Sequence, residues 1–414
     1  MSSTINIIVF GSSYITAALI RNLLYLPDCK IIVIDRKDPH YVLNQNLKAG
    51  LEALSTSVAD LYKNVDYIHS FKLNPQDPLS FLYFNPITDS IKLIDELSKL
   101  DKIDIVLDTA MMFDPHYSES NTIDTVNINT TYVTAIFDVL SHLPTIPRLY
   151  IALSSGIVYG KQDIKSLPVN ETADCKPIGV RAGSLHARES LVISLSAALE
   201  IASIILRLGN PIGYYTPYEN VLNQFVKAKL LKQPLVFEGD GTQARDFFDL
   251  NDLSQLVFKI VSNVLGTKEI EKPAHQTDPT TDKDKKRLTG FEYVNKIKNQ
   301  IYNIAGHHTK GEAPINLITL DRLVITALGE IKIPEVQGKV IVKNSRRKEV
   351  PFRFNFEKDL VIQMDTTKAI EVLEYDPTYN ILDTIKSEVV PFVAHNYLNY
   401  SDEQMEDLKK TLRL

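Results

Sequence analysis

The chain has 414 residues and a formal net charge of −6, and its 44% hydrophobic and 23% charged residues match an average globular composition. Two cysteines, Cys29 and Cys175, are too few for a disulfide framework or a cysteine zinc site, so a reducing, cytoplasmic location is expected. No apolar run approaches the roughly 18 residues of a membrane span, and the start lacks the cationic segment of a cleaved signal. The absence of a basic block argues against nucleic acid as the main partner.

Short apolar strands alternate with helical patterns along the first half of the chain. Residues 5–10 form an unbroken apolar run typical of a buried strand, residues 11–13 favour a turn, and apolar residues recur at helical spacing from 19 to 24. Further strands are predicted at 31–34, 103–107, 149–153 and 204–207. This alternation predicts an α/β fold, a Rossmann-like doubly wound parallel sheet with helices on both faces.

Domain boundaries are predicted where this alternation loosens. Residues 1–203, with returning segments, are expected to form the Rossmann-like lobe, and residues 204–395 mainly a smaller C-terminal α/β lobe. Residues 267–290 contain eleven charged side chains and only three hydrophobic ones, too few to offset the entropy of ordering, and predict a disordered insertion. Residues 396–414 predict a helical tail, which Ser401 would cap in a Ser-x-x-Gln pattern.

Three segments, in order along the chain, carry a resemblance to a known family. They are Ser154–Gly160 (SSGIVYG), Leu206–Gly213 (LRLGNPIG) and Gly239–Asp246 (GDGTQARD). Together they resemble the extended short-chain dehydrogenase/reductase family of NAD-dependent nucleotide-sugar epimerases and dehydratases, over about residues 5–395. The resemblance implies a dinucleotide in the first lobe, a nucleoside diphosphate sugar under the second, and hydride transfer assisted by Ser, Tyr and Lys.

The glycine turn departs from the family pattern. The family's Gly-x-x-Gly-x-x-Gly falls on Gly11, Tyr14 and Ala17, so only Gly11 matches. Those glycines permit a tight turn, approach of the backbone to the pyrophosphate, and close packing of helix on strand. Starting one residue earlier, at Phe10, gives no glycine at all. The sequence therefore predicts that NAD binds weakly or not at all.

Four further residues are candidate cofactor contacts. Asp35 ends the second strand, where a carboxylate would bind the adenosine ribose, and Arg36 beside it is suited to a 2′-phosphate; both could equally be an ordinary polar strand end. Ser12 and Ser13 could donate hydrogen bonds to a phosphate at the helix N-terminus, or one of them could simply cap the helix.

The catalytic positions depart further from the family. Ser155 occupies the position of the catalytic hydroxyl, but alignment on Glu189 places Arg181 where the family has Tyr and Leu185 where it has Lys. No tyrosine in the chain has a lysine four positions later. Arginine keeps its proton at neutral pH and cannot act as a base, and losing general-base catalysis costs about 10²- to 10⁴-fold.

Substitute bases and metal ligands have little support. Tyr159 or His186 could act as the base, but neither has the spacing; the alternative roles are packing for Tyr159 and a helix surface for His186. His307 and His308 lack a third metal ligand, so no metal is expected.

The substrate side is better preserved. By the resemblance, Arg245 corresponds to the family arginine that contacts the nucleotide diphosphate, and Asn210 to the asparagine near the sugar diphosphate. A guanidinium suits phosphate because it donates two aligned, charged hydrogen bonds. The structural alternatives are an ion pair of Arg245 with Asp246 or Asp249, and a turn closed by Asn210.

The leading hypothesis is a member of this family that has lost redox catalysis and acts as a nucleotide-sugar-binding, scaffold or regulatory subunit. An active epimerase or dehydratase with an unusual site, and an RNA-associated or other complex subunit, are the alternatives. A homodimer, or a heterodimer with a paralogue, is expected through helices at 122–140 and 181–200. The apolar contact residues expected there are Ile128, Ala135, Val139, Leu191, Leu195 and Leu199.

Overall fold

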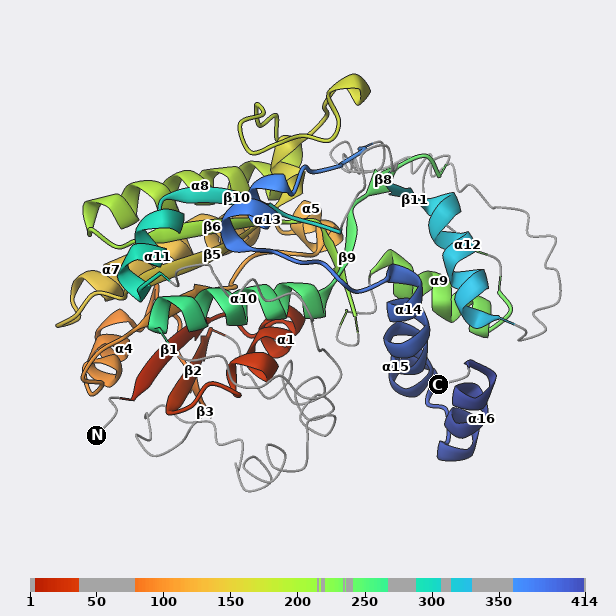
Figure 1. The fold of residues 1–414 in the computed structure, drawn as a ribbon, viewed down its shortest axis with the longest axis horizontal. Helices are drawn as coiled ribbons and strands as arrows, with labels where there is room; N and C mark the ends of the chain where they lie inside the picture. The colour runs from red at the N-terminus through yellow and green to blue at the C-terminus, as the bar shows by residue number, and fades with distance from the viewer. Residues whose placement is uncertain are drawn as a thin grey trace.

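A seven-stranded parallel sheet organises the first lobe (Figure 1). The computed structural model describes residues 4–36, 79–213, 216, 220–233, 235, 241–266, 288–306, 314–329 and 360–412. The strand order is β10-β6-β5-β4-β1-β2-β3. The strands are β1 (Ile5–Phe10), β2 (Cys29–Asp35), β3 (Leu79–Tyr83), β4 (Ile105–Asp108), β5 (Leu149–Ser155), β6 (Ser203–Leu208) and β10 (Gln300–Ile304). The predicted doubly wound α/β class is confirmed.

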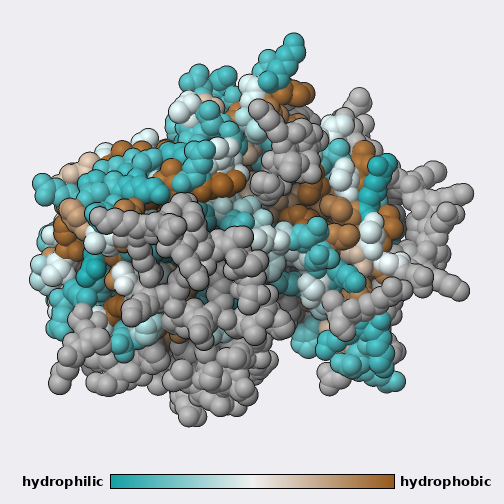
Figure 2. Space-filling model, in the orientation of Figure 1, coloured by the Kyte–Doolittle hydropathy of each residue, from teal (hydrophilic) through white to brown (hydrophobic). Residues whose placement is uncertain are grey.

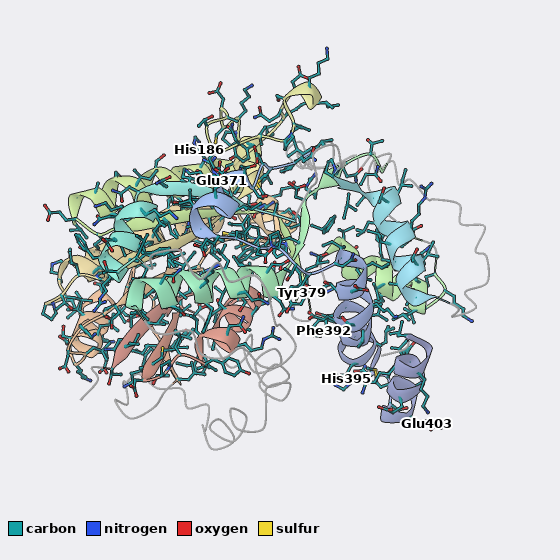
Figure 3. The ribbon with its side chains drawn as sticks, viewed as in Figure 1. His186, Glu371, Tyr379, Phe392, His395 and Glu403 are labelled. Atoms are coloured by element: carbon teal, nitrogen blue, oxygen red, sulfur yellow. The ribbon has the colours of Figure 1, made fainter. Side chains whose placement is uncertain are left out.

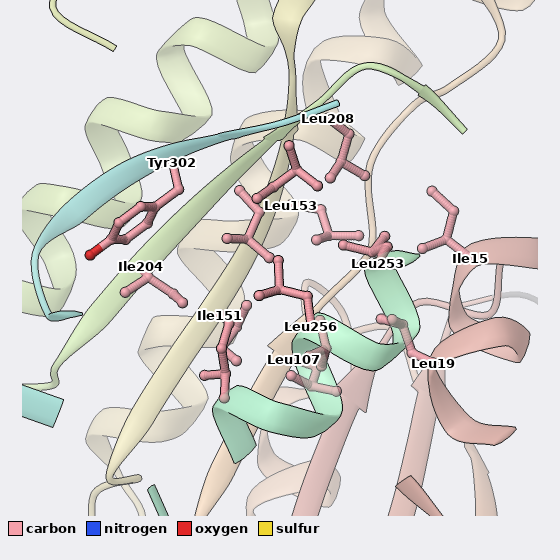
Figure 4. Packing of buried hydrophobic residues seen from close by; sticks show 14 of the residues in the cluster. Ile15, Leu19, Leu107, Ile151, Leu153, Ile204, Leu208, Leu253, Leu256 and Tyr302 are labelled. Atoms are coloured by element: carbon pink, nitrogen blue, oxygen red, sulfur yellow. The ribbon is translucent and has the colours of Figure 1, made fainter. Parts of the chain in front are cut away.

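Helices cover both faces of this sheet because its strands are apolar on both sides. One face packs against α1 (Tyr14–Leu23), α10 (Leu250–Leu265), α11 (Gly290–Ile297) and α13 (Thr367–Leu373). The other face packs against α4 (Ser90–Leu97), α7 (Tyr132–Ser141) and α8 (Gly179–Ala198). Figure 4 shows the first core, where Leu253 and Leu256 of α10 meet Ile151 of β5 and Leu107 of β4.

A second, smaller lobe has a core of its own. Its helices are α9 (Val221–Leu230), α12 (Leu317–Leu328), α14 (Ile381–Thr384), η4 (Ile385–Val389), α15 (Val390–Leu398) and α16 (Asp402–Leu412). Two small sheets accompany them, pairing β7 (Asn210–Ile212) with β9 (Phe247–Asp249), and β8 (Ala244–Arg245) with β11 (Ile315–Asn316). The two lobes are interleaved, because α10, β10 and α13 return to the first lobe after the chain has entered the second.

The predicted C-terminal helix is present. The Ser401 N–H donates to Gln404 Oε1 at 2.9 Å, and the Gln404 N–H donates to Ser401 Oγ at 3.3 Å, which is the expected capping pattern. The apolar side of α16 joins the second core through Leu408 and Leu412, and its outer side is hydrophilic (Figure 2). Most of the predicted disordered insertion, residues 267–287, lies outside the described residues; Thr289 caps α11.

The predicted helix at 122–140 is interrupted. It consists of α6 (Thr122–Val126), a π turn η1 (Asn127–Thr131) and α7, after a short helix α5 (Pro115–Ser120). Val139 is wholly buried in the first lobe, and Leu191, Leu195 and Leu199 pack partly against the same core. The expectation that these apolar residues form a dimer contact is therefore wrong for Val139, because the apolar side of an amphipathic helix faces its own sheet first. None of the helices in the described part of the chain has the length and apolar character to span a bilayer.

Candidate functional site

The candidate site lies at the carboxyl ends of β1, β2 and β4. β1 pairs with β2 on one side and β4 on the other, so the connections leave it in opposite directions, which is the position where open α/β sheets bind their ligands as a rule. Gly11 follows β1 with a φ of +97°, and a Cβ there would lie 2.8 Å from the Ala110 nitrogen. Only glycine fits this approach of the turn to the segment after β4.

The turn is closed by hydrogen bonds to its own neighbours. The Ser12 N–H and hydroxyl both donate to Asp35 Oδ2, at 2.6 and 2.5 Å. Ser13 caps α1: its N–H donates to Thr16 Oγ1 at 3.1 Å, and the Thr16 N–H donates back to Ser13 Oγ at 3.4 Å. Of the two roles that the sequence left open for these serines, Ser13 therefore has the role of helix cap. The N–H groups of Ser12 and Ser13 before the helix, and of Thr16 in its first turn, thus have acceptors within the protein, in a region where N–H groups usually donate to a bound phosphate.

Arg36 has an acidic partner. Its Nη1 and Nη2 lie 3.1 and 3.2 Å from the two carboxylate oxygens of Asp124 on α6, and the Tyr117 hydroxyl donates to the same carboxylate at 2.7 Å. The hydrogen bond to Asp124 raises the pKa of Tyr117. Arg36 is therefore held by a bidentate ion pair across the end of β2.

An aromatic pair joins α1 to the segment after β4, and Arg181 of α8 contacts that segment. The rings of Tyr14 and Phe113 meet edge to face with centroids 5.7 Å apart, and Arg181 Nη1 donates to the Phe113 carbonyl at 3.4 Å. Burial raises the pKa of Tyr14, and the positive charge of Arg181 opposes that shift. Arg181, which the sequence alignment predicts at the family's tyrosine position, lies in the first turn of α8. Leu185, one turn later, is wholly buried in the first core.

The two serines that end β5 have different surroundings. Ser155 is half-buried, and its Oγ accepts from the Ile157 N–H at 3.4 Å, capping the short helix η2 (Gly156–Tyr159). Ser154 is buried and donates to Glu189 Oε1 at 2.6 Å. Glu189 in turn accepts from Arg207 Nε and Nη2 at 2.9 and 2.7 Å. This buried ion pair fixes α8 against β6, so the helix that carries Arg181 has a defined position.

The two residues considered as substitute bases have different surroundings. Tyr159 is buried and donates to Asn303 Oδ1 at 2.8 Å, and burial raises its pKa to about 12. A phenol with such a pKa keeps its proton at neutral pH. His186 lies on α8, half-buried (Figure 3).

Asn210 and Arg245 lie on neighbouring small sheets. The Asn210 N–H donates to the Asp246 carbonyl at 2.6 Å where β7 pairs with β9. Arg245 is half-buried on β8, and its Nη1 donates to the Ala244 carbonyl at 3.0 Å and to the Leu360 carbonyl. The beginning of the third motif, Gly239 and Asp240, lies outside the described residues, as do His307 and His308. No group of three or more possible metal ligands occurs among the residues that the structure describes.

Asn129 is a site residue that sequence reasoning missed. It is wholly buried in the π turn, accepts from the Met112 N–H at 2.9 Å and donates to Ser184 Oγ at 2.9 Å. It therefore ties the segment that carries Phe113 to the helix that carries Arg181. The sequence shows a polar residue in a helical pattern, and nothing in that pattern distinguishes a buried asparagine from an exposed one.

Comparisons with known proteins agree with this architecture. Residues 7–270 match the model of the NAD dependent epimerase/dehydratase family. A protein of Methanocaldococcus jannaschii named "Putative UDP-glucose 4-epimerase" is 25% identical over 167 residues, which are 40% of this chain and 54% of that protein. This chain thus spans about half the length of that curated relative.

Solved structures resemble the chain over nearly its whole length. DesIV, a dTDP-glucose 4,6-dehydratase of Streptomyces venezuelae solved with NAD and TYD bound, has a TM-score of 0.68 at 17% identity, covering 96% of this chain and 99% of its own. UDP-glucuronic acid 4-epimerase of Bacillus cereus, in complex with UDP-glucuronic acid and NAD, has a TM-score of 0.64 at 18% identity, covering 96% and 100%.

Proposed function

Because the chain belongs to the NAD-dependent epimerase/dehydratase family, we propose that it is a nucleotide-sugar-binding member, a scaffold or regulatory subunit that has lost standard redox catalysis. The observation that carries the proposal is the pair Arg181 and Leu185 on α8. A guanidinium stays protonated at neutral pH and cannot take a proton from a sugar hydroxyl. A wholly buried leucine supplies no charge to lower the pKa of a neighbouring acid.

Weak binding of a nicotinamide dinucleotide is the second part of the proposal. The N–H groups of Ser12, Ser13 and Thr16 already have acceptors, so a phosphate would compete with bonds that the folded turn makes. The Tyr14 ring, packed on Phe113, takes up room beside the turn. Displacing either set of contacts costs free energy, and this cost weakens the net binding of a cofactor.

A nucleoside diphosphate sugar is the proposed ligand. The DesIV and UDP-glucuronic acid 4-epimerase structures are described with nucleotide ligands, and this chain keeps Arg245 and Asn210 of the corresponding segments. Arg245 is half-buried on β8, next to β11, where a forked cationic group suits a diphosphate.

The test combines ligand titration with a turnover assay. UDP-glucose and UDP-glucuronic acid are titrated by calorimetry, and nicotinamide absorbance and sugar products are followed with NAD added. We expect heat of binding without turnover. Arg245→Ala is expected to weaken binding about tenfold to a hundredfold, as loss of a charge-assisted contact of about 1.5–3 kcal/mol predicts.

The matched control is Arg322→Ala, an exposed arginine on α12, which should bind as the unmodified protein does. Turnover by the unmodified protein would replace this proposal with the active-enzyme alternative. Equal binding by Arg245→Ala and Arg322→Ala would remove the diphosphate site.

A further inference from the structure

A short run of chain, residues 360–364, is tied to the strand that carries Arg245. Arg245 Nη1 donates to the Leu360 carbonyl at the beginning of this run. At its end, the N–H of Met364 donates to Oδ2 of Asp246, the residue that follows Arg245, at 2.5 Å. Met364 is 1% exposed. Both ends of the run are therefore fixed to the segment of the proposed diphosphate contact.

Met364 also packs against the turn that follows β5. A Cβ placed on Gly156 would lie 2.5 Å from Met364 Sδ, so the methionine side chain lies directly on this glycine. Gly156 follows Ser155, the last residue of β5. The segment that carries Arg245 and the carboxyl end of β5 therefore meet at Met364.

Helix α8 places Arg181 beyond this end of β5. Ser154 donates to Glu189 Oε1 at 2.6 Å, so the middle of α8 lies beside the last residues of β5. Arg181 precedes Glu189 by eight residues, which is a rise of about 12 Å along the helix axis. The Phe113 carbonyl, which accepts from Arg181 Nη1 at 3.4 Å, follows the end of β4. Both observations place the guanidinium beyond the carboxyl ends of β4 and β5.

Buried polar contacts hold the turn of helix that carries Arg181. The Ser184 hydroxyl donates to the Arg181 carbonyl at 3.2 Å and accepts from Asn129 Nδ2 at 2.9 Å. Asn129 is wholly buried in the π turn, so the backbone of Arg181 has a defined place. Arg181 itself is half-buried. A charged hydrogen bond is stronger in such a position than in open water, because the surrounding protein screens it less.

A positioned guanidinium beside a sugar distinguishes sugars by their charge. UDP-glucose and UDP-glucuronic acid differ only at carbon 6, which carries a hydroxymethyl group in the first and a carboxylate in the second. A carboxyl group is ionised at neutral pH, and the planar fork of an arginine matches its two oxygens in a bidentate pair. A hydroxymethyl group offers a single oxygen and no charge, so it gains much less from the same arginine.

We propose that Arg181 selects nucleoside diphosphate sugars whose sugar is acidic, a hexuronate, by pairing with the sugar carboxylate. In this arrangement the diphosphate lies at Arg245, and the sugar extends past Met364 to the end of β5, where Arg181 binds the carboxylate. A residue that cannot act as a base thereby has a role in recognition. The inference rests on the proposed function, because it names the sugar that the proposed site takes.

Calorimetric titration of the full-length protein with UDP, UDP-glucose and UDP-glucuronic acid tests the proposal. The unmodified protein is expected to bind UDP-glucuronic acid about tenfold to a hundredfold more tightly than UDP-glucose, as a charge-assisted pair predicts. Arg181→Gln should lose this preference and keep the affinity for UDP-glucose. Arg181→Lys keeps the charge without the fork and should keep part of the preference. Arg322→Gln, which removes an exposed arginine on α12, should keep all of it.

Equal affinities of the unmodified protein for UDP-glucose and UDP-glucuronic acid would overturn the inference and leave the proposed function in place; this comparison needs no variant to fold. A preference that persists in Arg181→Gln would assign the carboxylate to another residue. An equal loss of affinity for UDP and both sugars in Arg181→Gln would assign Arg181 to the diphosphate. Either result overturns the inference. If none of these ligands binds, the proposed function fails and the inference fails with it.

Discussion

Leu185 is wholly buried among the side chains of the first core, so its replacement tests whether this position of α8 can admit a charge. Leu185→Lys is expected to destabilise the protein by more than about 2 kcal/mol, because an ammonium group in this position would lie in apolar surroundings. Urea unfolding measures the change. Leu185→Met is the control, with an expected cost below about 1.5 kcal/mol. Equal stability of the two variants would mean that the position can admit a charge.

Gly11 offers a second residue-scale prediction. Alanine at this position would combine a φ of +97° with a Cβ placed 2.8 Å from the Ala110 nitrogen, and a loss of about 1–3 kcal/mol is expected. Thermal unfolding gives the comparison with Gly183→Ala, a helical position where a Cβ meets nothing within 4 Å. That control should be neutral or stabilised by up to about 1 kcal/mol. A Gly11→Ala variant as stable as the control would contradict the close approach.

The outer sides of α6 and α8 expose apolar side chains that could form a contact between two chains. Ile123 is 78% exposed, Val126 40% and Ile193 45%, whereas Val139 lies in the core. We propose a dimer, with itself or with a paralogue, through these outer sides. Light scattering at micromolar concentration should then give twice the 46.7 kDa of one chain.

Ile193→Asp is the matching variant for this assembly. A carboxylate buried at the contact should favour monomers, whereas Ile164→Asp, at a position 75% exposed outside these helices, should leave the dimer intact. If the unmodified protein is monomeric, the homodimer is ruled out. If Ile193→Asp has the same mass as the unmodified dimer, the contact does not include Ile193.

Among the elements, the central strands were predictable and the edge strands were not. β1, β2, β4, β5 and β6 are buried, mostly apolar runs, and the sequence predicts each of them. The edge strands β3 and β10 escaped prediction; β10 reads QIYNI, with Gln300 and Asn303 interrupting the apolar pattern. The π turn also escaped prediction; such turns are rare and occur mostly as single turns inside α-helices.

At the candidate site, the sequence supplied positions but not contacts. It placed Arg181 and Leu185 on one helix, and α8 contains both. It did not reveal that Asp124 pairs with Arg36, since 88 residues separate them, or that Asn129 joins two segments of the site. Partners distant in the chain are brought together only by the folded sheet, so local patterns carry no signal for them.

Cofactor retention is a property of the whole molecule. Because the β1–α1 turn is closed by its own hydrogen bonds, the purified protein is expected to release no NAD on denaturation, as mass spectrometry of the released ligands would show. Calorimetry provides the second measurement. A sub-micromolar affinity for either nicotinamide dinucleotide would refute weak binding.

The interleaving of the lobes also determines when the first lobe can be completed during synthesis. Strand β10 and helices α10 and α13, which complete one face and one edge of the first sheet, lie after the chain has already entered the second lobe. During synthesis, strands β1 to β6 and helix α1 therefore leave the ribosome before α10, α11 and α13, which cover the rest of the same face. The last helix of this face, α13, ends at Leu373, so this chain completes its first lobe only when its synthesis is nearly finished.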